Sequence, residues 1–198
     1  MASDKKGAIQ RGATLVFHDE GGFSLKPNLR RTWAPRGQTP IVRHKFNWER
    51  VHAVGALACC PDGSQAQLLV YLQETAINAE AIIAYLSALH EHIPGLIILL
   101  WDGLPSHRSK KVAAYLAANQ DWLEVERFPG YAPELNPVEY VWSCWKGKDL
   151  SNSGPDDTLE IVERLLLAQE RVGQEPDTLY GFLVASTLYE KQNACTST

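Results

Sequence analysis

The sequence contains no apolar run near the ~18 residues that a membrane-spanning helix needs. The longest continuous apolar stretch, residues 96–101, has the length of a buried strand. The first six residues, Met1 to Lys6, also lack the apolar core of a secretory signal. We therefore expect neither a membrane anchor nor export.

The four cysteines form no pattern typical of a disulfide framework or a zinc site. Cys59 and Cys60 are adjacent, Cys144 and Cys195 stand alone, and there is no CxxC or Cys/His zinc spacing. We therefore expect reduced thiols in a cytoplasmic protein.

Two common enzyme signatures are missing as well. The apolar stretch 96–101 followed by Asp102 resembles a Walker B strand, but an ATPase also needs a GxxxxGK[ST] loop, which the chain lacks. There is no GxSxG elbow either, which argues against a serine hydrolase.

Charge is unevenly distributed along the 198 residues, a length that allows one substantial core and a small appendage. The net charge of −4 argues against a protein that coats nucleic acid nonspecifically. One segment nevertheless holds many cations against the single acid Glu49: Lys26, Arg30, Arg31, Arg36, Arg43, Lys45 and Arg50. This segment is either a phosphate-contacting surface or a solvated basic loop.

The hydrophobic pattern predicts an α/β fold with a mixed sheet flanked by helices. Strands are expected at 13–17, 23–33, 50–59, 67–73, 96–101 and 123–128, with a turn at Gly21-Gly22. Helices are expected from about 79 to Pro94-Gly95, over 109–119, from Pro137, and over 158–172 and 178–191.

Three acidic residues lie at the ends of expected strands or at the start of an expected helix, where their carboxyl groups can come close together. Asp19 ends the first strand and Asp102 ends the apolar strand, so neighbouring parallel strands would bring both to one sheet edge. Glu139, in the first turn of the helix that begins at Pro137, can close the group. Such carboxylates repel one another unless a cation is present, and Mg²⁺ or Mn²⁺ prefers oxygen ligands. Two such ions about 3.5–4 Å apart support displacement at phosphorus.

Each acid also has a structural explanation. Asp19 and Asp102 precede glycines and suit ordinary turns. Glu139 is three residues after Asn136, where a capping-box glutamate reaches back to the cap.

The flanks of the three acids resemble the bacterial insertion-sequence branch of the Tc/mariner superfamily of DDE transposases. The resemblance rests on residues 17–23 with 29–40, on 100–109, and on 128–142, and it covers roughly 13–150. Its most specific part is Pro-Glu-Leu-Asn-Pro-Val-Glu at 133–139. Between Asp102 and Glu139 lie 36 residues (103–138), close to the spacing in this family.

The resemblance implies a ribonuclease-H-like DDE catalytic domain over 1–150, with a C-terminal helical extension at 151–198 packed on it. It implies that Asp19, Asp102 and Glu139 are catalytic and bind Mg²⁺ or Mn²⁺, as two ions. The family cleaves DNA at transposon ends, in terminal inverted repeats, and transfers the 3′-OH strand into target DNA, typically at a TA step. We accordingly expect a cytoplasmic protein, associated with the nucleoid of a prokaryote.

In the mariner branch an arm after the first aspartate reaches the partner subunit and DNA, and the basic segment at about 25–50 occupies that place. We therefore expect a homodimer, with DNA contacts from Lys26, Arg30, Arg31, Trp33, Arg36, Arg43, Lys45 and His107. His107 is alternatively a residue that orients a ligand, or a surface residue. Glu20 should point away from Asp19 and be structural, and Trp142 should pack beside Glu139.

The chain departs from the family at its N-terminus. Relatives carry helix-turn-helix domains ahead of the catalytic domain, whereas about a dozen residues precede the first strand here. We expect a separately encoded helix-turn-helix partner, a fragment or a degraded element. Two rival functions remain: a ribonuclease-H-like nuclease without strand transfer, and an inactive DNA-binding or dimerisation remnant.

Overall fold

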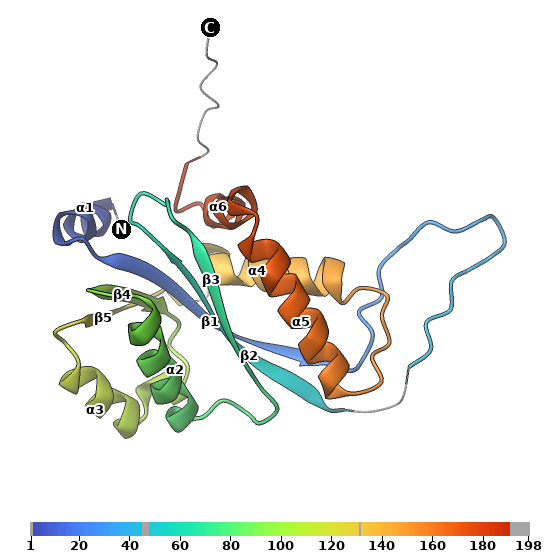
Figure 1. The fold of residues 1–198 in the computed structure, drawn as a ribbon, viewed down its shortest axis with the longest axis horizontal. Coiled ribbons are helices and arrows are strands. Elements are labelled where there is room, and N and C mark those ends of the chain that lie inside the picture. Colours follow the sequence, from blue (N-terminus) through green and yellow to red (C-terminus); the bar gives the residue numbers. More distant parts are fainter. Residues whose placement is uncertain (1, 45–47, 131, 191–198) are drawn as a thin grey trace, which may run out of the picture.

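The computed structural model describes residues 2–44, 48–130 and 132–190, which form a mixed sheet between two groups of helices (Figure 1). The sheet has five strands in the order β3-β2-β1-β4-β5. Their bounds are β1 Thr14–Ser24, β2 Arg50–Cys59, β3 Gln67–Gln73, β4 Ile97–Trp101 and β5 Leu123–Arg127. The strands β3, β2 and β1 are antiparallel, while β1, β4 and β5 are parallel. The predicted mixed sheet is confirmed.

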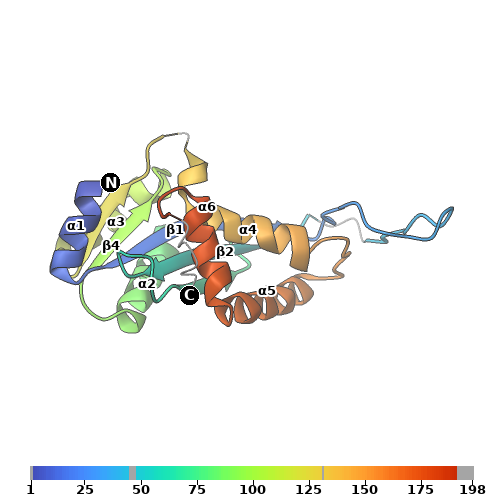
Figure 2. The same cartoon turned by 90° about the horizontal axis from the view of Figure 1, so that it is seen from above.

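The two faces of the sheet are covered by different helices (Figures 1 and 2). One face packs against α2 (Ala79–His92) and α3 (Lys110–Ala118). The other packs against α4 (Pro137–Cys144), α5 (Thr158–Gly173) and α6 (Pro176–Ala185). Helix α1 (Ala2–Arg11) precedes β1, and a π-helical turn, η3 (Trp145–Asp149), continues α4. No helix in the described part of the chain is long and apolar enough to span a membrane.

The apolar run at 96–101 behaves as its composition predicts. Ile97, Leu99 and Trp101 belong to the core under α2 and α3, whereas Ile98 and Leu100 belong to the core under α4 to α6. Because successive side chains of a strand alternate in direction, a strand buried on both faces needs continuous apolar sequence.

Three sequence expectations are wrong, and one helix was missed. The pair Gly21-Gly22 is not a turn, since β1 runs through it to Ser24 in register with β2. A second strand does not form at 23–33, because the chain leaves the sheet after Ser24. Helix α6 ends at Ala185, short of the expected 191, and α1 was not expected at all. Gly21 instead allows close packing of Trp142 on the strand, because a Cβ at this position would lie 3.1 Å from the Trp142 ring.

The described part of the basic segment, residues 26–44, projects from the body as an arm (Figures 1 and 2). Its described part contains no helix or extended strand. Its base is fixed by a bridge between Asn28 and Ser151, by a hydrogen bond from the Asn28 amide to the Lys146 carbonyl, and by one from the Arg30 backbone N–H to Asn152 Oδ1 at 2.8 Å. The arm is therefore anchored at one end and exposed beyond it.

Candidate active site

The parallel pairing of β1 and β4 brings Asp19 and Asp102 to the same edge of the sheet. Phe17 of β1 pairs with Leu100 of β4. Asp19 comes two residues after Phe17, and Asp102 comes two residues after Leu100. Strand β4 ends at Trp101, while β1 continues to Ser24. The chain after β4 therefore lies beside the free edge of β1, as the sequence interpretation requires.

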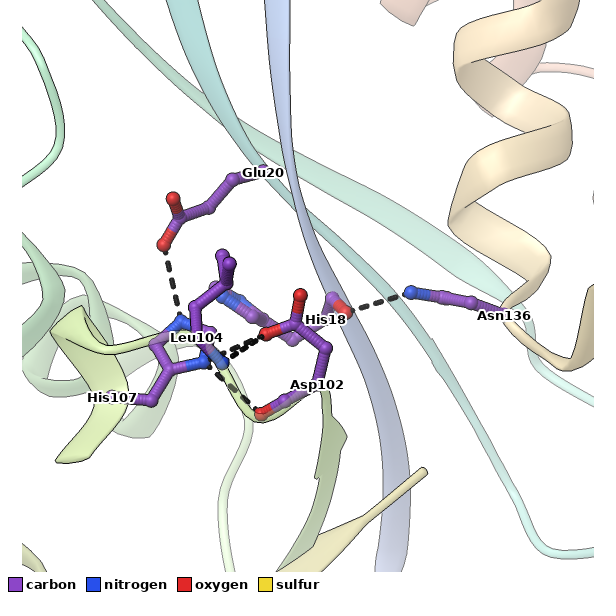
Figure 3. Close-up of polar contacts among 6 residues, drawn as sticks. All are labelled: His18, Glu20, Asp102, Leu104, His107 and Asn136. Carbon is purple, nitrogen blue, oxygen red and sulfur yellow. Dashed lines mark hydrogen bonds and ion pairs between the residues drawn. The ribbon is translucent and has the colours of Figure 1, made fainter. Parts of the chain in front are cut away.

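Glu139 is held near them by the cap of α4. The Asn136 side-chain oxygen accepts a hydrogen bond from Val138 N–H at 3.1 Å, and its amide donates to the His18 carbonyl at 3.0 Å (Figure 3). This buried amide therefore joins the start of α4 to β1, next to Asp19. The capping-box alternative for Glu139 is wrong, because the Asn136 N–H is donated to the Pro133 carbonyl at 2.9 Å.

The three acids line one cleft of about 520 Å³. Its walls also include the segments 103–105 and 128–130, together with Arg108. The guanidinium of Arg108 lies close over Gly103, where a Cβ would come within 2.8 Å of Arg108 Nη2. The cleft thus combines three carboxyl groups with one cation at its wall, and the sequence interpretation missed Arg108.

Asp19 is the most perturbed of the acids. Its pKa is raised to about 7 overall, mainly by burial and then by the negative charges of Glu139 and Asp102. Hydrogen bonds from the Trp142 indole, at 2.9 Å to Oδ2, and from the Glu20 backbone N–H act in the opposite direction. A carboxyl group whose ionisation is opposed by burial and by two other acids is one that a bound cation would stabilise.

The donor chemistry fits hard divalent ions, since carboxylate oxygens are the ligands that Mg²⁺ and Mn²⁺ prefer. The acids are not gathered around one point. In the described part of the chain, the group whose ligand atoms all lie within 4.8 Å of one another is His18, Glu20 and His107. Two ions about 3.5–4 Å apart span a wider set of ligands than one ion does, which is compatible with the spread of the acids.

His107 contacts one of the acids from a buried position. The residue is 3% exposed, and its ring stacks on Trp101 with centroids 4.2 Å apart. Nδ1 lies 3.0 Å from Asp102 Oδ1, and Nε2 lies 3.1 Å from Glu20 Oε1 (Figure 3). Burial lowers the pKa of His107, but the hydrogen bonds and charges of Glu20 and Asp102 outweigh it and raise the pKa overall.

The surface alternative for His107 is therefore wrong, and the burial of its ring gives no support to the expected direct contact with DNA. Glu20 does lie on the face of β1 opposite Asp19, as expected, because alternate residues of a strand face opposite ways. It still contributes to the site's surroundings through His107. The sequence shows no local signal for this contact, which joins residues 87 apart.

The other described residues that were expected to contact DNA are not part of the cleft lining. Lys26, Arg30, Arg31, Arg36 and Arg43 are exposed along the arm, and Trp33 is 99% exposed there. Lys45 lies outside the described residues. The structure thus separates an acidic cleft from a basic projecting arm.

Comparison with known proteins gives one family and one fold. The family described as DDE superfamily endonuclease matches residues 14–159. No curated protein matches the chain in sequence.

Among solved structures, the chain is similar to the Mos1 mariner paired-end complex with Mn, at 18% identity and a TM-score of 0.59, covering 96% of this chain and 61% of that one. It is also similar to the catalytic domain of Mos1 mariner transposase, at 15% identity and a TM-score of 0.55, covering 96% and 89%. The predicted ribonuclease-H-like fold is confirmed. The chain spans about 61% of the length of the transposase in that paired-end complex.

Proposed function

Because the chain belongs to the DDE superfamily of endonucleases, we propose that it is the catalytic domain of a DNA transposase of the bacterial insertion-sequence branch of Tc/mariner. It cleaves DNA at transposon ends and transfers the 3′-OH strand into target DNA. The observation that supports this most directly is the convergence of Asp19, Asp102 and Glu139 on one cleft. In this proposal residues 1–150 are the catalytic domain and 151–198 a helical extension packed on it.

The three acids hold two Mg²⁺ or Mn²⁺ ions, which when bound supply the Lewis acidity for in-line displacement at phosphorus. Trp142 orients the Asp19 carboxylate through its indole N–H. His107 orients Asp102, and Asn136 fixes the helix that carries Glu139. Arg108, on the cleft wall, binds a phosphate oxygen of the DNA backbone.

DNA is the partner that the arm would contact, through Lys26, Arg30, Arg31, Arg36, Arg43 and Lys45, with Trp33 against a base or a partner subunit. The solved relatives include Mos1 transposase complexes with transposon ends. We extend the proposal to a homodimer acting on the nucleoid in a prokaryotic cytoplasm, with sequence recognition supplied by a separately encoded helix-turn-helix protein.

The proposal is tested with short duplexes that present a free 3′-OH end, mixed with a supercoiled plasmid and Mn²⁺. Joined products are expected from the native chain. Asp102→Asn should reduce them by about 10²–10³-fold, the scale of losing one group that stabilises transition-state charge.

Three other results would decide against a transposase with this active site. Nicking without joined products would indicate the nuclease alternative. Equal products from the native chain and Asp102→Asn would mean that the cleft is not the catalytic site. DNA binding with neither product would indicate the inactive remnant.

A further inference from the structure

A second group of metal-ligating side chains lies on the face of β1 opposite Asp19. His18 and Glu20 come from β1, and His107 comes from the short 3₁₀ helix η1 (Ser106–Arg108) (Figure 3). One ligand atom from each lies within 4.8 Å of the other two. None of the three lines the cleft of the acids, so this group is a separate place in the fold.

His18 is buried without a hydrogen-bond partner on either ring nitrogen. The residue is 1% exposed, and neither Nδ1 nor Nε2 meets a donor or acceptor in the described part of the chain. Its ring centroid lies 5.3 Å from that of Tyr85, 5.8 Å from that of Trp101 and 5.3 Å from that of His107. Buried polar atoms are normally paired, so a side chain in this position is expected to bind something.

His107 meets an oxygen acceptor at each of its two nitrogens. A neutral imidazole carries one N–H, so when Nδ1–H is donated to the Asp102 backbone carbonyl at 3.2 Å, Nε2 presents a lone pair to the Glu20 carboxylate. A cation between Nε2 and Glu20 removes this conflict. A proton would serve those two groups and leave His18 unpaired, whereas a metal ion would engage all three.

We propose that His18, Glu20 and His107 bind a late first-row transition-metal ion of the zinc class. Two imidazoles and one carboxylate are a donor set found at three-ligand Zn²⁺ sites. Mg²⁺ prefers oxygen and keeps its waters, so it is a poor competitor for this set. The Nδ1–H of His107 then donates to the backbone carbonyl of Asp102, and a histidine ligand is commonly oriented by such a bond from its other ring nitrogen.

The ion fixes the tautomer of His107 that donates to Asp102. It therefore holds the backbone of Asp102 in place from outside the acidic cleft, and with it the carboxylate, whose Oδ1 lies 3.0 Å from Nδ1. This consequence for Asp102 rests on the proposed function, whereas binding of the ion does not, because the ligands lie outside the cleft.

The test uses the full chain, freed of metal with a chelator, and Zn²⁺ as the probe, with no DNA present. After equilibrium dialysis against Zn²⁺ in excess Mg²⁺, one Zn²⁺ per chain is expected by mass spectrometry of the metal. Glu20→Gln keeps the shape of the side chain and removes its charge. His18→Phe keeps the ring contacts and removes the nitrogens. Each of these two substitutions should weaken Zn²⁺ binding by about 100-fold. This is at least the loss of affinity that follows when a residue hydrogen-bonded to a metal ligand is changed.

Two variants serve as controls. Cys60→Ser removes a free thiol that could itself bind zinc and should leave the affinity unchanged. Asp19→Asn should abolish the proposed DNA cleavage while leaving Zn²⁺ bound. The cleavage function and the zinc site can therefore fail independently of each other.

Unchanged Zn²⁺ affinity in Glu20→Gln would overturn the site, even if the chain binds zinc elsewhere. The proposed zinc site would also be overturned if the native chain bound no Zn²⁺. If His18→Phe does not fold, Glu20→Gln alone decides the question, because Glu20 is at the edge of the core and its side chain is 18% exposed.

Discussion

At the scale of single residues, the position of Asp19 depends on how Trp142 is seated. The indole donates its N–H to Asp19 and lies over Gly21 and Gly55 on the sheet. A Cβ at Gly55 would come within 2.6 Å of the ring, a contact that real structures avoid. The absence of two side chains on the strands thus makes room for the residue that orients an acid.

Gly55→Ala should therefore displace Trp142 and destabilise the fold by about 1–3 kcal/mol, the usual cost of overpacking a core. Metal-dependent cleavage should fall with it, because Asp19 loses its hydrogen bond. Chemical denaturation followed by tryptophan fluorescence measures the first effect. Gly22→Ala is the matched control, since nothing lies within 4 Å of a Cβ there. Equal losses in the two variants would contradict the role of Trp142.

The raised pKa of Asp19 gives a pH dependence of stability with a definite sign. Its pKa rises from 3.8 to about 7 on folding, so the folded state holds a proton that the unfolded state has lost between these values. Stability of the metal-free chain relative to Asp19→Asn should therefore decrease as pH rises from about 4 to 7, by at most about 4 kcal/mol.

Urea denaturation of both proteins across this range measures the difference. Added Mn²⁺ at pH 8 should restore stability to the native chain and not to Asp19→Asn. A difference that stays constant with pH would show that Asp19 ionises normally.

At the scale of elements, the side chain of Asn136 makes two structural hydrogen bonds at the start of α4. It caps the helix and donates its amide to the His18 carbonyl on β1. Helix α5 begins with a comparable cap, Asp157, whose side chain accepts a hydrogen bond from Glu160 N–H at 3.0 Å. The two caps differ in that only the first adjoins the acids.

Asn136→Ala should cost about 1–2 kcal/mol of stability, as loss of a helix cap does, and should also lower DNA cleavage because Glu139 shifts. Asp157→Ala should cost a similar amount of stability without a matching loss of cleavage. Thermal unfolding and plasmid nicking, measured on both variants, separate the effects. Equal activity in the two variants would show that the cap has no part in positioning Glu139.

The elements also show which parts of the fold the sequence can predict. Strand β4 was predictable because burial on both faces imposes a continuous apolar run. The length of β1 was not, because glycines usually mark turns, and at Gly21 the glycine instead accommodates a ring from α4, far along the chain. The shared edge of Asp19 and Asp102 followed from strand order, whereas the contact of Glu20 with His107 depends on a loop path that no periodicity encodes.

At the scale of the whole molecule, the acids of the cleft and the cations of the arm lie in different parts of the fold. The acids line a cleft on the body. The arm, which carries exposed cations, projects to one side (Figure 2). A cleft of this charge repels phosphates unless metal ions neutralise it. The exposed cations of the arm supply attraction for a DNA backbone, in addition to Arg108 at the cleft wall.

Replacing Arg30, Arg31 and Arg36 with Gln should flatten the salt dependence of DNA binding, by about 0.9 in slope for each phosphate that is no longer neutralised. Fluorescence anisotropy at several salt concentrations measures the slope. Arg11→Gln is the control, because Arg11 is in α1, at the other end of the molecule from the arm (Figure 1). An unaltered slope in the triple variant would exclude the arm from DNA binding.

The anchoring of the arm has a mechanical consequence. The Asn28 amide is bonded to the Lys146 carbonyl, inside the π-helical turn that continues α4, the helix of Glu139. A force on the arm is therefore transmitted to the C-terminal end of that helix, whereas Glu139 is in its first turn. Strain from bent or captured DNA would be delivered through this linkage to Glu139, while Asp19 stays fixed in β1 and Asp102 directly after the end of β4.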